Sequence, residues 1–236
     1  LSIKDEIDDA ISSVINDTAF IKGRYVEEFE ESFSEEYKTS HVVSCANGTD
    51  AIYIALKSLN IGHGDEVITT SLSWISTSET ISQTGAKPVF VDIDKDLFTI
   101  DCDQIEKKIN EKTKAIIPVH LYGQPVDMDK VMLLAKKYKL RVIEDCAQAH
   151  FAQWNNQNVG TIGDIGTFSF FPGKNLGAYG DAGCLITNDS SLAEKARKFA
   201  NHGALVKHEH EIEGINSRLD GLQAAILSVK IKYIHK

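Results

Sequence analysis

The stretch AIIPVHLYGQPVDMDKVMLLAKKYKLRVIED, residues 115–145, decides the fold class of this chain. Its apolar run at 115–121 is typical of a β-strand, and residues 127–138 repeat apolar side chains at helical spacing. Residues 141–145 form a second apolar run that ends in a carboxylate. Two such runs joined by a helix predict a crossover unit with parallel strands. Because both runs are continuously apolar rather than alternating, we expect strands buried on both faces.

The same alternation of apolar runs and helical patterns extends along the chain on both sides of this unit. The further apolar runs cover residues 42–45, 66–69, 88–93, 166–170 and 183–187, and the further helical patterns cover 49–59, 75–83 and 103–109. Two amphipathic helices are expected ahead of them, from Ile3 to Ile15 and from Val26 to Tyr37. We therefore predict an α/β fold with a mostly parallel central sheet, helices on both faces, and a ligand site at the carboxyl ends of the strands.

The composition excludes several classes of protein. The 236 residues carry 25 Lys and Arg against 34 Asp and Glu, so the formal net charge is -9. An acidic chain without a Lys/Arg-rich run is a poor match for nucleic-acid backbone, and no apolar run approaches the roughly 18 residues of a membrane span. Because the first ten residues also lack the apolar core of a signal peptide, we expect a cytoplasmic protein that binds neither nucleic acid nor membrane.

Neither a disulfide framework nor a metal site is expected. The four cysteines, Cys45, Cys102, Cys146 and Cys184, are scattered without CxxC spacing. His150 invites a metal interpretation, but no second ligand stands at a suitable spacing from it.

The first candidate site is SCANGTD, residues 44–50, which follows an apolar run and opens a helical pattern. Gly48 lets the backbone approach a ligand closely, and the free amides and dipole of a helix N-terminus favour an anion. A phosphate suits this position, with the Thr49 hydroxyl adding a hydrogen bond. The alternative is that Asn47 or Thr49 merely caps the helix.

The second candidate is VIEDCAQAH, residues 142–150, where an apolar strand ends in the carboxylate of Asp145 and Gln148 follows three residues later. A carboxylate at the carboxyl end of a strand is well placed to hold a protonated ring nitrogen. The alternative is that Asp145 caps a following helix.

The third candidate is FSFFPGKNLG, residues 168–177. Burial among aromatic and glycine residues disfavours the ammonium form of Lys174, which lowers its pKa and makes the amine nucleophilic towards carbonyls. Ser169, on the preceding strand, could donate to a phosphate. The P-loop pattern GxxxxGK[ST] and the dinucleotide pattern GxGxxG are both absent. The remaining alternative is a lysine that happens to lie in a turn.

Taken together and in this order, the three segments indicate a site for pyridoxal phosphate (PLP). Lys174 would bind the cofactor covalently, and Asp145 would keep its pyridine nitrogen protonated so that the ring accepts electrons. The helix N-terminus and Ser169 would hold the phosphate.

Five segments make the sequence similar to the DegT/DnrJ/EryC1/StrS family of PLP-dependent nucleotide-sugar aminotransferases. They are CANGTDA (45–51), GDEVITTSLSWISTSE (64–79), VIEDCAQAH (142–150), SFFPGKNLGAYGDAG (169–183) and EGINSRLDGLQAAIL (213–227). The resemblance implies the large domain of PLP-dependent transferase fold type I, the fold of aspartate aminotransferase.

The resemblance also implies a role for each matching residue. Lys174 matches the Schiff-base lysine, Asp145 the partner of the pyridine nitrogen, and Gln148 the residue that bonds the ring hydroxyl. Trp74 matches the aromatic residue that stacks on the pyridine ring, which suits its flat face. Without the resemblance, a core tryptophan would be the preferred interpretation of Trp74.

The cofactor phosphate is expected to be held from two subunits. Gly48, Thr49 and Ser169 match its ligands within one chain. Asn216 matches an asparagine that reaches the cofactor phosphate of the neighbouring subunit. The resemblance therefore implies a homodimer.

The sequence departs from the family pattern at two places. Relatives often have glycine where Phe151 stands. Arg218 has no settled role, and an ion pair with Asp220 or a neighbouring carboxylate is one option. Relatives also continue past the last helix into a smaller C-terminal domain. This chain starts at Leu1 and stops at Lys236 within a helical pattern, so we interpret it as truncated.

The expected organisation has three segments. Residues 1–40 form an N-terminal helical segment, and residues 41–220 form the PLP-binding large domain. Residues 221–236 begin the helix that leads to a C-terminal domain, which is largely missing.

The function implied is transfer of an amino group from an amino acid, glutamate by resemblance, to the keto sugar of a nucleoside-diphosphate sugar. One alternative is a PLP- or PMP-dependent sugar dehydratase, although such relatives have histidine in place of the lysine at 174. A second is a non-catalytic truncated fragment that retains the cofactor cradle. A third, a dinucleotide-dependent oxidoreductase, lacks the glycine fingerprint. The sugar, the nucleotide and the choice between C3 and C4 stay open.

Overall fold

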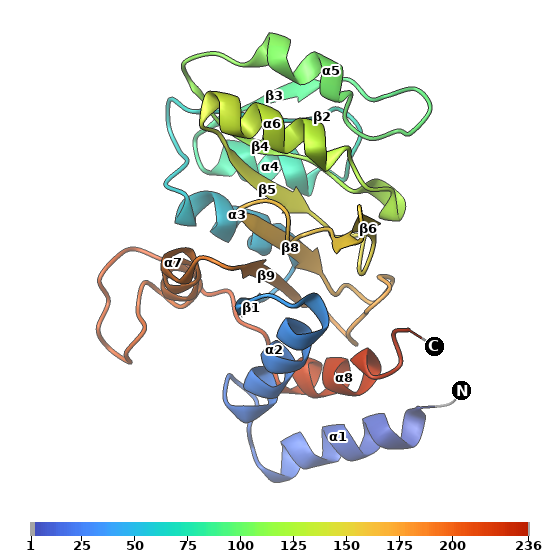
Figure 1. The fold of residues 1–236 in the computed structure, drawn as a ribbon. Coiled ribbons are helices and arrows are strands. Elements are labelled where there is room, and N and C mark those ends of the chain that lie inside the picture. Colours follow the sequence, from blue (N-terminus) through green and yellow to red (C-terminus); the bar gives the residue numbers. More distant parts are fainter. Residues whose placement is uncertain (1–2, 236) are drawn as a thin grey trace.

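A seven-stranded sheet forms the centre of the computed structural model, which describes residues 3–235. In spatial order the strands are β1 (His41–Cys45), β9 (Gly183–Thr187), β8 (Ile165–Ser169), β5 (Arg141–Asp145), β4 (Thr113–Ile117), β2 (Glu66–Thr70) and β3 (Lys87–Val91). The neighbours from β8 to β3 are parallel, whereas β9 runs antiparallel to both β8 and β1. The prediction of a mostly parallel α/β sheet is confirmed (Figure 1).

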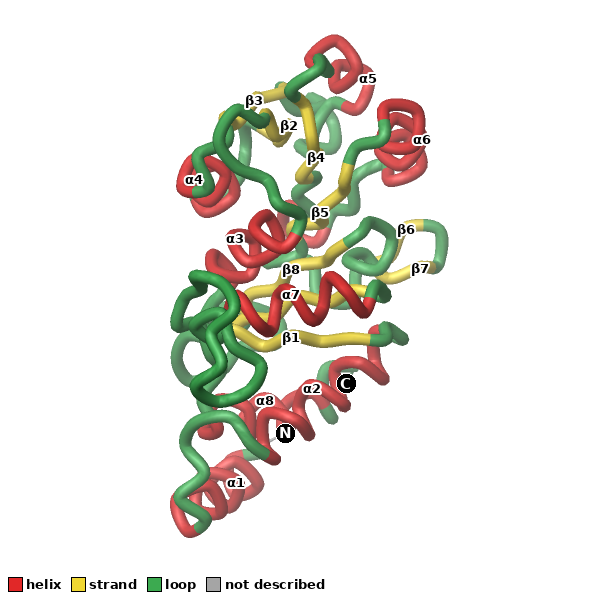
Figure 2. The backbone as a smooth tube through the Cα atoms, turned by 90° about the vertical axis from the view of Figure 1, so that its left-hand side faces the viewer, coloured by secondary structure: helices red, strands yellow, loops and turns green. Residues whose placement is uncertain are grey.

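Helices cover both faces of the sheet, as predicted (Figure 2). One face carries α3 (Gly48–Ser58), α4 (Ser76–Gln83) and α7 (Ser190–Ala200), and the other carries α5 (Cys102–Ile105), the 3-10 turn η1 (Glu106–Lys108) and α6 (Met128–Tyr138). The two-residue period of a strand explains this arrangement. On β1, Val42 packs into the cluster of Phe29, whereas the next residue, Val43, packs into the cluster of Ile54 on α3.

Three helices from the two ends of the chain pack together beside β1. They are α1 (Lys4–Asn16), α2 (Arg24–Tyr37) and α8 (Gly221–Ile231). Phe33 of α2 is fully buried, and its ring lies 4.6 Å from that of Tyr37 and 5.3 Å from that of Phe168. Burying one such ring contributes about 2–3 kcal/mol. These contacts fix the N-terminal helices to the strand that leads towards Lys174.

The structure differs from the predicted elements in several places. β4 ends at Ile117 because Pro118 lacks the N–H that would continue a ladder, and a 3-10 turn, η2 (Leu121–Gly123), follows it. The sequence pattern did not indicate α7 or the small hairpin of β6 (Gln153–Trp154) and β7 (Gln157–Asn158).

The last helix is shorter than the sequence pattern indicated. α8 ends at Ile231 and a turn follows at 232–235, so the helix stops before the last described residue. Leu1, Ser2 and Lys236 lie outside the described residues. Between residues 3 and 235, every helix is too short or too polar to cross a bilayer.

Candidate active site

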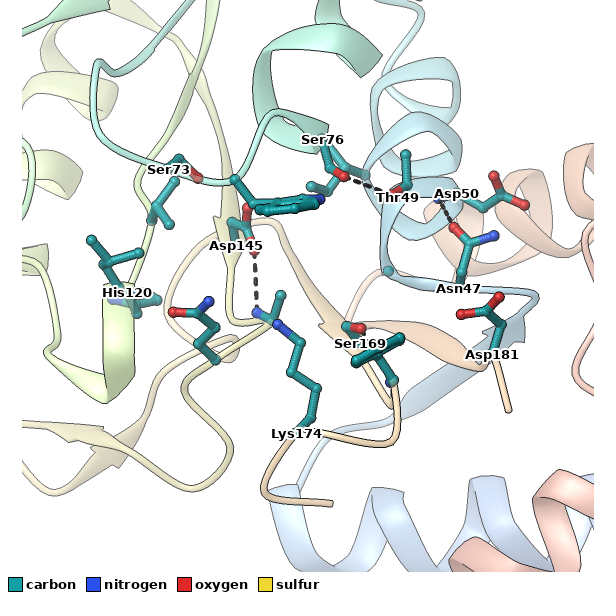
Figure 3. Close-up of a pocket in the computed structure, with 18 residues that line it drawn as sticks. Asn47, Thr49, Asp50, Ser73, Ser76, His120, Asp145, Ser169, Lys174 and Asp181 are labelled. Carbon is teal, nitrogen blue, oxygen red and sulfur yellow. Dashed lines mark hydrogen bonds between the residues drawn. The ribbon is translucent and has the colours of Figure 1, made fainter. Parts of the chain in front are cut away.

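A cavity of about 670 Å³ opens where the predicted ligand site lies, at the carboxyl ends of β5 and β8. Seven of the predicted site residues line it: Gly48, Thr49, Trp74, Asp145, Gln148, Ser169 and Lys174. The first of them, Gly48, and the last, Lys174, are more than a hundred residues apart in the sequence. The sheet brings all seven to one edge (Figure 3). Asn216, expected to serve a neighbouring subunit, does not line the cavity.

The N-terminus of α3 forms one end of the cavity. The Asn47 side chain caps this helix by accepting a hydrogen bond from the Asp50 amide at 2.8 Å. The capping alternative is therefore correct for Asn47. It does not exclude anion binding, because the amides of Gly48 and Thr49 in the first turn have no acceptor within the helix.

Gly48 allows α3 to begin directly against the end of β8. A Cβ at this position would lie 2.6 Å from Ser169 Cβ and 3.1 Å from Ser169 Cα. The close approach brings the Ser169 hydroxyl to the same end of the cavity as the α3 amides.

Ser76 is a further polar residue at this end that the sequence analysis did not single out. Its hydroxyl lies 2.7 Å from the Thr49 hydroxyl, and both residues line the cavity. Ser76 follows Trp74 by two residues within the 64–79 segment, which was the available signal.

Asp145 ends β5 and lies at the bottom of the cavity, 5% exposed. Its carboxylate accepts hydrogen bonds from the Thr77 hydroxyl at 2.8 Å and from the Ala147 amide at 3.1 Å. Burial raises the pKa of Asp145, and these two bonds act in the opposite direction. A turn rather than a helix follows Asp145, so the helix-capping alternative is wrong.

Lys174 projects into the same cavity from the loop after β8, and Figure 3 shows its side chain extending towards Asp145. Its amide donates to the Phe171 carbonyl at 2.8 Å, so the residue does lie in a tight turn. Burial lowers the pKa of Lys174, while the Asp145 carboxylate acts to raise it. A lysine with a lowered pKa facing a cavity is suited to nucleophilic chemistry.

Trp74 and Gln148 complete the wall. Trp74 is 74% exposed and lines the cavity, so it is not a core tryptophan. The Gln148 side chain accepts a hydrogen bond from the Tyr122 amide at 3.1 Å. That bond engages the oxygen of the Gln148 amide and leaves its nitrogen as the donor end.

A buried hydrogen-bond network lies next to the cavity, which one of its members, His120, lines. Glu144 is fully buried and accepts hydrogen bonds from the amides of residues 160, 162 and 163 at 2.7–2.8 Å. Its carboxylate also lies 3.1 Å from His120 Nε2, while His120 Nδ1 accepts from the Val126 amide. Cys146 lies near this pair. Burial raises the pKa of its thiol and so disfavours the thiolate form that binds metals. The hydrogen bonds occupy the His120 and Glu144 atoms that a metal would use, so we interpret the cluster as structural.

His150 is buried between the rings of Phe168 and Phe170. Both of its ring nitrogens lack a hydrogen-bond partner among the described residues. Burial lowers its pKa to about 3, so the ring is neutral at physiological pH.

The structure places two residues that the sequence left open. Phe151 adopts a φ of 60°, a conformation that favours glycine. The Phe151 amide donates to the Tyr37 hydroxyl at 2.8 Å. Among residues 3–235, Arg218 forms no ion pair, so the pairing with Asp220 is not observed.

Comparisons with known proteins show which sequences this chain is similar to. The chain is 50% identical to the pleiotropic regulatory protein of Geobacillus stearothermophilus, over 99% of this chain and 63% of that protein. It is 48% identical to the UDP-N-acetyl-3-dehydro-α-D-glucosamine 3-aminotransferase of Acidithiobacillus ferrooxidans, over 98% of this chain and 63% of that protein. The chain thus spans less than two thirds of these relatives' length.

The fold is also similar to that of a solved structure. DesV of S. venezuelae, in complex with a ketimine intermediate, superposes with a TM-score of 0.96 at 42% identity, covering 98% of this chain and 62% of DesV. The DegT/DnrJ/EryC1/StrS aminotransferase family matches residues 1–236. Because the family model matches the full length of the sequence, this chain belongs to the DegT/DnrJ/EryC1/StrS aminotransferase family.

Proposed function

We propose that this chain binds pyridoxal phosphate through Lys174 and serves amino transfer to a nucleotide-linked keto sugar. The observation that carries the proposal is that Lys174 and Asp145 share one cavity, at whose other end lies the N-terminus of α3. A cavity of about 670 Å³ is within the range of sites for small cofactors and substrates.

The residues at the α3 end of the cavity suit the phosphate of this cofactor. The Gly48 and Thr49 amides, with the hydroxyls of Thr49, Ser76 and Ser169, offer donors to a phosphate dianion. The close approach of α3 to β8, which a Cβ at Gly48 would prevent, keeps these donors together.

The other end of the cavity suits the reactive part of the cofactor. Asp145 is held by Thr77 and Ala147 as an acceptor for the protonated ring nitrogen. Trp74 offers a flat apolar wall.

When bound, pyridoxal phosphate supplies an electron-accepting ring that stabilises negative charge at the α-carbon of an amino acid. Lys174 anchors the cofactor at rest and, once displaced by the amino donor, its free Nζ removes the donor's α-proton. The lowered pKa of Lys174 favours the neutral amine that both tasks require.

The acceptor is proposed from the relatives, and glutamate as the donor is proposed from the resemblance to the family. Glutamate gives up its amino group and leaves as 2-oxoglutarate, and the keto group of a nucleoside-diphosphate sugar becomes an amine. The printed activity of the Acidithiobacillus ferrooxidans relative, on a UDP-linked 3-keto sugar, supports this class of acceptor. We also propose a homodimer in which Asn216, exposed and outside its own cavity, contacts the cofactor phosphate of the neighbouring subunit.

The proposal is tested by trapping the cofactor. The protein is incubated with pyridoxal phosphate, reduced with borohydride and digested, and the modified peptide is identified by mass spectrometry. We expect modification at Lys174 and its loss in Lys174→Ala. Lys22→Ala is the matched control, because burial also lowers the pKa of Lys22 although it lines a different cavity. Covalent trapping that persists in Lys174→Ala would refute the assignment.

The acceptor is tested by screening UDP- and dTDP-linked keto sugars with glutamate and measuring 2-oxoglutarate. Cofactor trapping with no amino transfer to any of them would favour the cofactor-binding fragment over an active enzyme.

A further inference from the structure

The cavity is lined by more acidic than basic side chains. Of the described residues that line it, Asp50, Asp145 and Asp181 are acids and Lys174 alone is a lysine. Asp145 has the proposed ring nitrogen as its partner. Asp50, by contrast, lies in the first turn of α3, next to the amides proposed to hold a dianion. A carboxylate so close to a phosphate repels it unless the carboxylate is held away.

Ser217 contacts this turn at two points. Its Oγ lies 2.6 Å from Asp50 Oδ2 and 3.0 Å from the Ala46 amide nitrogen. Because a carboxylate is only an acceptor, the Ser217 hydroxyl donates to Asp50 and accepts from the Ala46 N–H. One hydroxyl therefore holds both the Asp50 side chain and the backbone just before the turn.

The Ser217 hydroxyl is itself fixed in place. The residue is 1% exposed, and its amide donates to the Ala200 carbonyl at 3.0 Å. Because its backbone is anchored in this way, Ser217 presents its hydroxyl to Asp50 from a fixed position. Figure 3 shows the Asp50 carboxylate on the opposite side of the turn from Lys174, as this contact requires.

We propose that Ser217 is a positioning residue that holds the Asp50 carboxylate away from the phosphate of the cofactor. The proposal rests on the proposed PLP site and extends it to a residue outside the cavity. Without the hydroxyl, the Asp50 carboxylate and the Ala46 amide both lose a partner. The negative charge is then free to turn towards the phosphate position, and the turn is no longer tied to the 213–220 segment.

The test compares pyridoxal phosphate with pyridoxal, which has the same ring and aldehyde but no phosphate. Dissociation constants for both are measured by visible absorbance on the wild-type protein and on Ser217→Ala. We expect Ser217→Ala to weaken binding of pyridoxal phosphate about tenfold, the order of effect of one added charge repulsion at the effective dielectric of a partly buried site. Binding of pyridoxal is expected to be unchanged, because no repulsion acts on it.

Asp50→Asn identifies the cause of this loss. Its amide oxygen still accepts from Ser217, but its charge is gone. In the Ser217→Ala background, Asp50→Asn should restore most of the affinity for pyridoxal phosphate. On its own it should leave that affinity equal or raise it, a measurement that does not depend on Ser217→Ala folding.

The outcomes separate the two proposals. Equal loss for both ligands in Ser217→Ala would indicate a general structural role and overturn the inference, as would no loss at all. A failure of Asp50→Asn to restore affinity, or weaker phosphate-dependent binding in Asp50→Asn alone, would also overturn it. If the wild-type protein binds neither compound, the proposed PLP site itself is wrong.

Discussion

Replacing Gly48 by alanine tests whether close contact between α3 and β8 builds the phosphate end of the cavity. The new Cβ would lie 2.6 Å from Ser169 Cβ, whereas carbon atoms in contact prefer about 3.5–4.0 Å. The two elements must therefore separate by roughly 1 Å. Rotating the Ser169 side chain cannot relieve the contact, because Ser169 Cα is only 3.1 Å away.

The expected magnitude combines two opposing effects. Overpacking of this kind costs about 1–3 kcal/mol, and alanine regains at most about 1 kcal/mol over glycine from helix propensity. We expect Gly48→Ala to lower the free energy of unfolding by about 1–2 kcal/mol. Binding of pyridoxal phosphate should weaken as well, because the Ser169 hydroxyl moves away from the α3 amides.

Equilibrium urea unfolding gives the stability change, and absorbance titration gives the cofactor affinity. Gly62→Ala is the matched control, because the nearest atom to its added Cβ, the Thr84 carbonyl oxygen, is 3.4 Å away. Its unfolding free energy should change by less than about 0.5 kcal/mol, with no change in cofactor binding. Wild-type stability together with wild-type cofactor affinity in Gly48→Ala would refute the reasoning.

Two further predictions follow from buried groups. Thr77→Val removes a 2.8 Å hydrogen bond that lowers the pKa of Asp145. The pH titration of bound-cofactor absorbance should therefore move to higher pH, with Thr77→Ser behaving as wild type; an unmoved titration would contradict this role. In the folded state the pKa of His150 is lowered from 6.5 to about 3, so between these values only the unfolded chain takes up the proton, and stability falls as pH falls. His150→Leu should remove up to about 1.4 kcal/mol of this loss per pH unit, as measured by urea unfolding below pH 6.5, and parallel curves for the two proteins would exclude the effect.

The sequence determined the sheet and the edge at which the site forms. Continuous apolar runs alternating with helical patterns specify parallel strands, and residues that follow such strands meet at one edge. Asp145 ends β5 as the pattern predicted, and Ser169 ends β8 one residue before the predicted end of its run at 170. Lys174 was identifiable because a lysine among aromatic and glycine residues is not a surface lysine.

Local chemistry left two interpretations open that only the structure resolved. Asn47 caps α3, yet the amides of Gly48 and Thr49 beside it stay free for a ligand. Trp74 lines the cavity rather than the core. The same residue types suit both environments, so their sequence pattern does not distinguish them.

By itself, then, the sequence determined the fold class and indicated the side chains proposed to react, because both depend on the periodicity of one segment and on the side chain at its end. Tertiary structure alone decided which polar groups support them. Ser76 reaches Thr49 from 27 residues away, and Ser217 reaches Asp50 from 167 residues away. Such contacts depend on how α3, α4 and the 213–220 segment pack against one sheet. No local pattern encodes that packing, because each hydroxyl on its own is an ordinary serine.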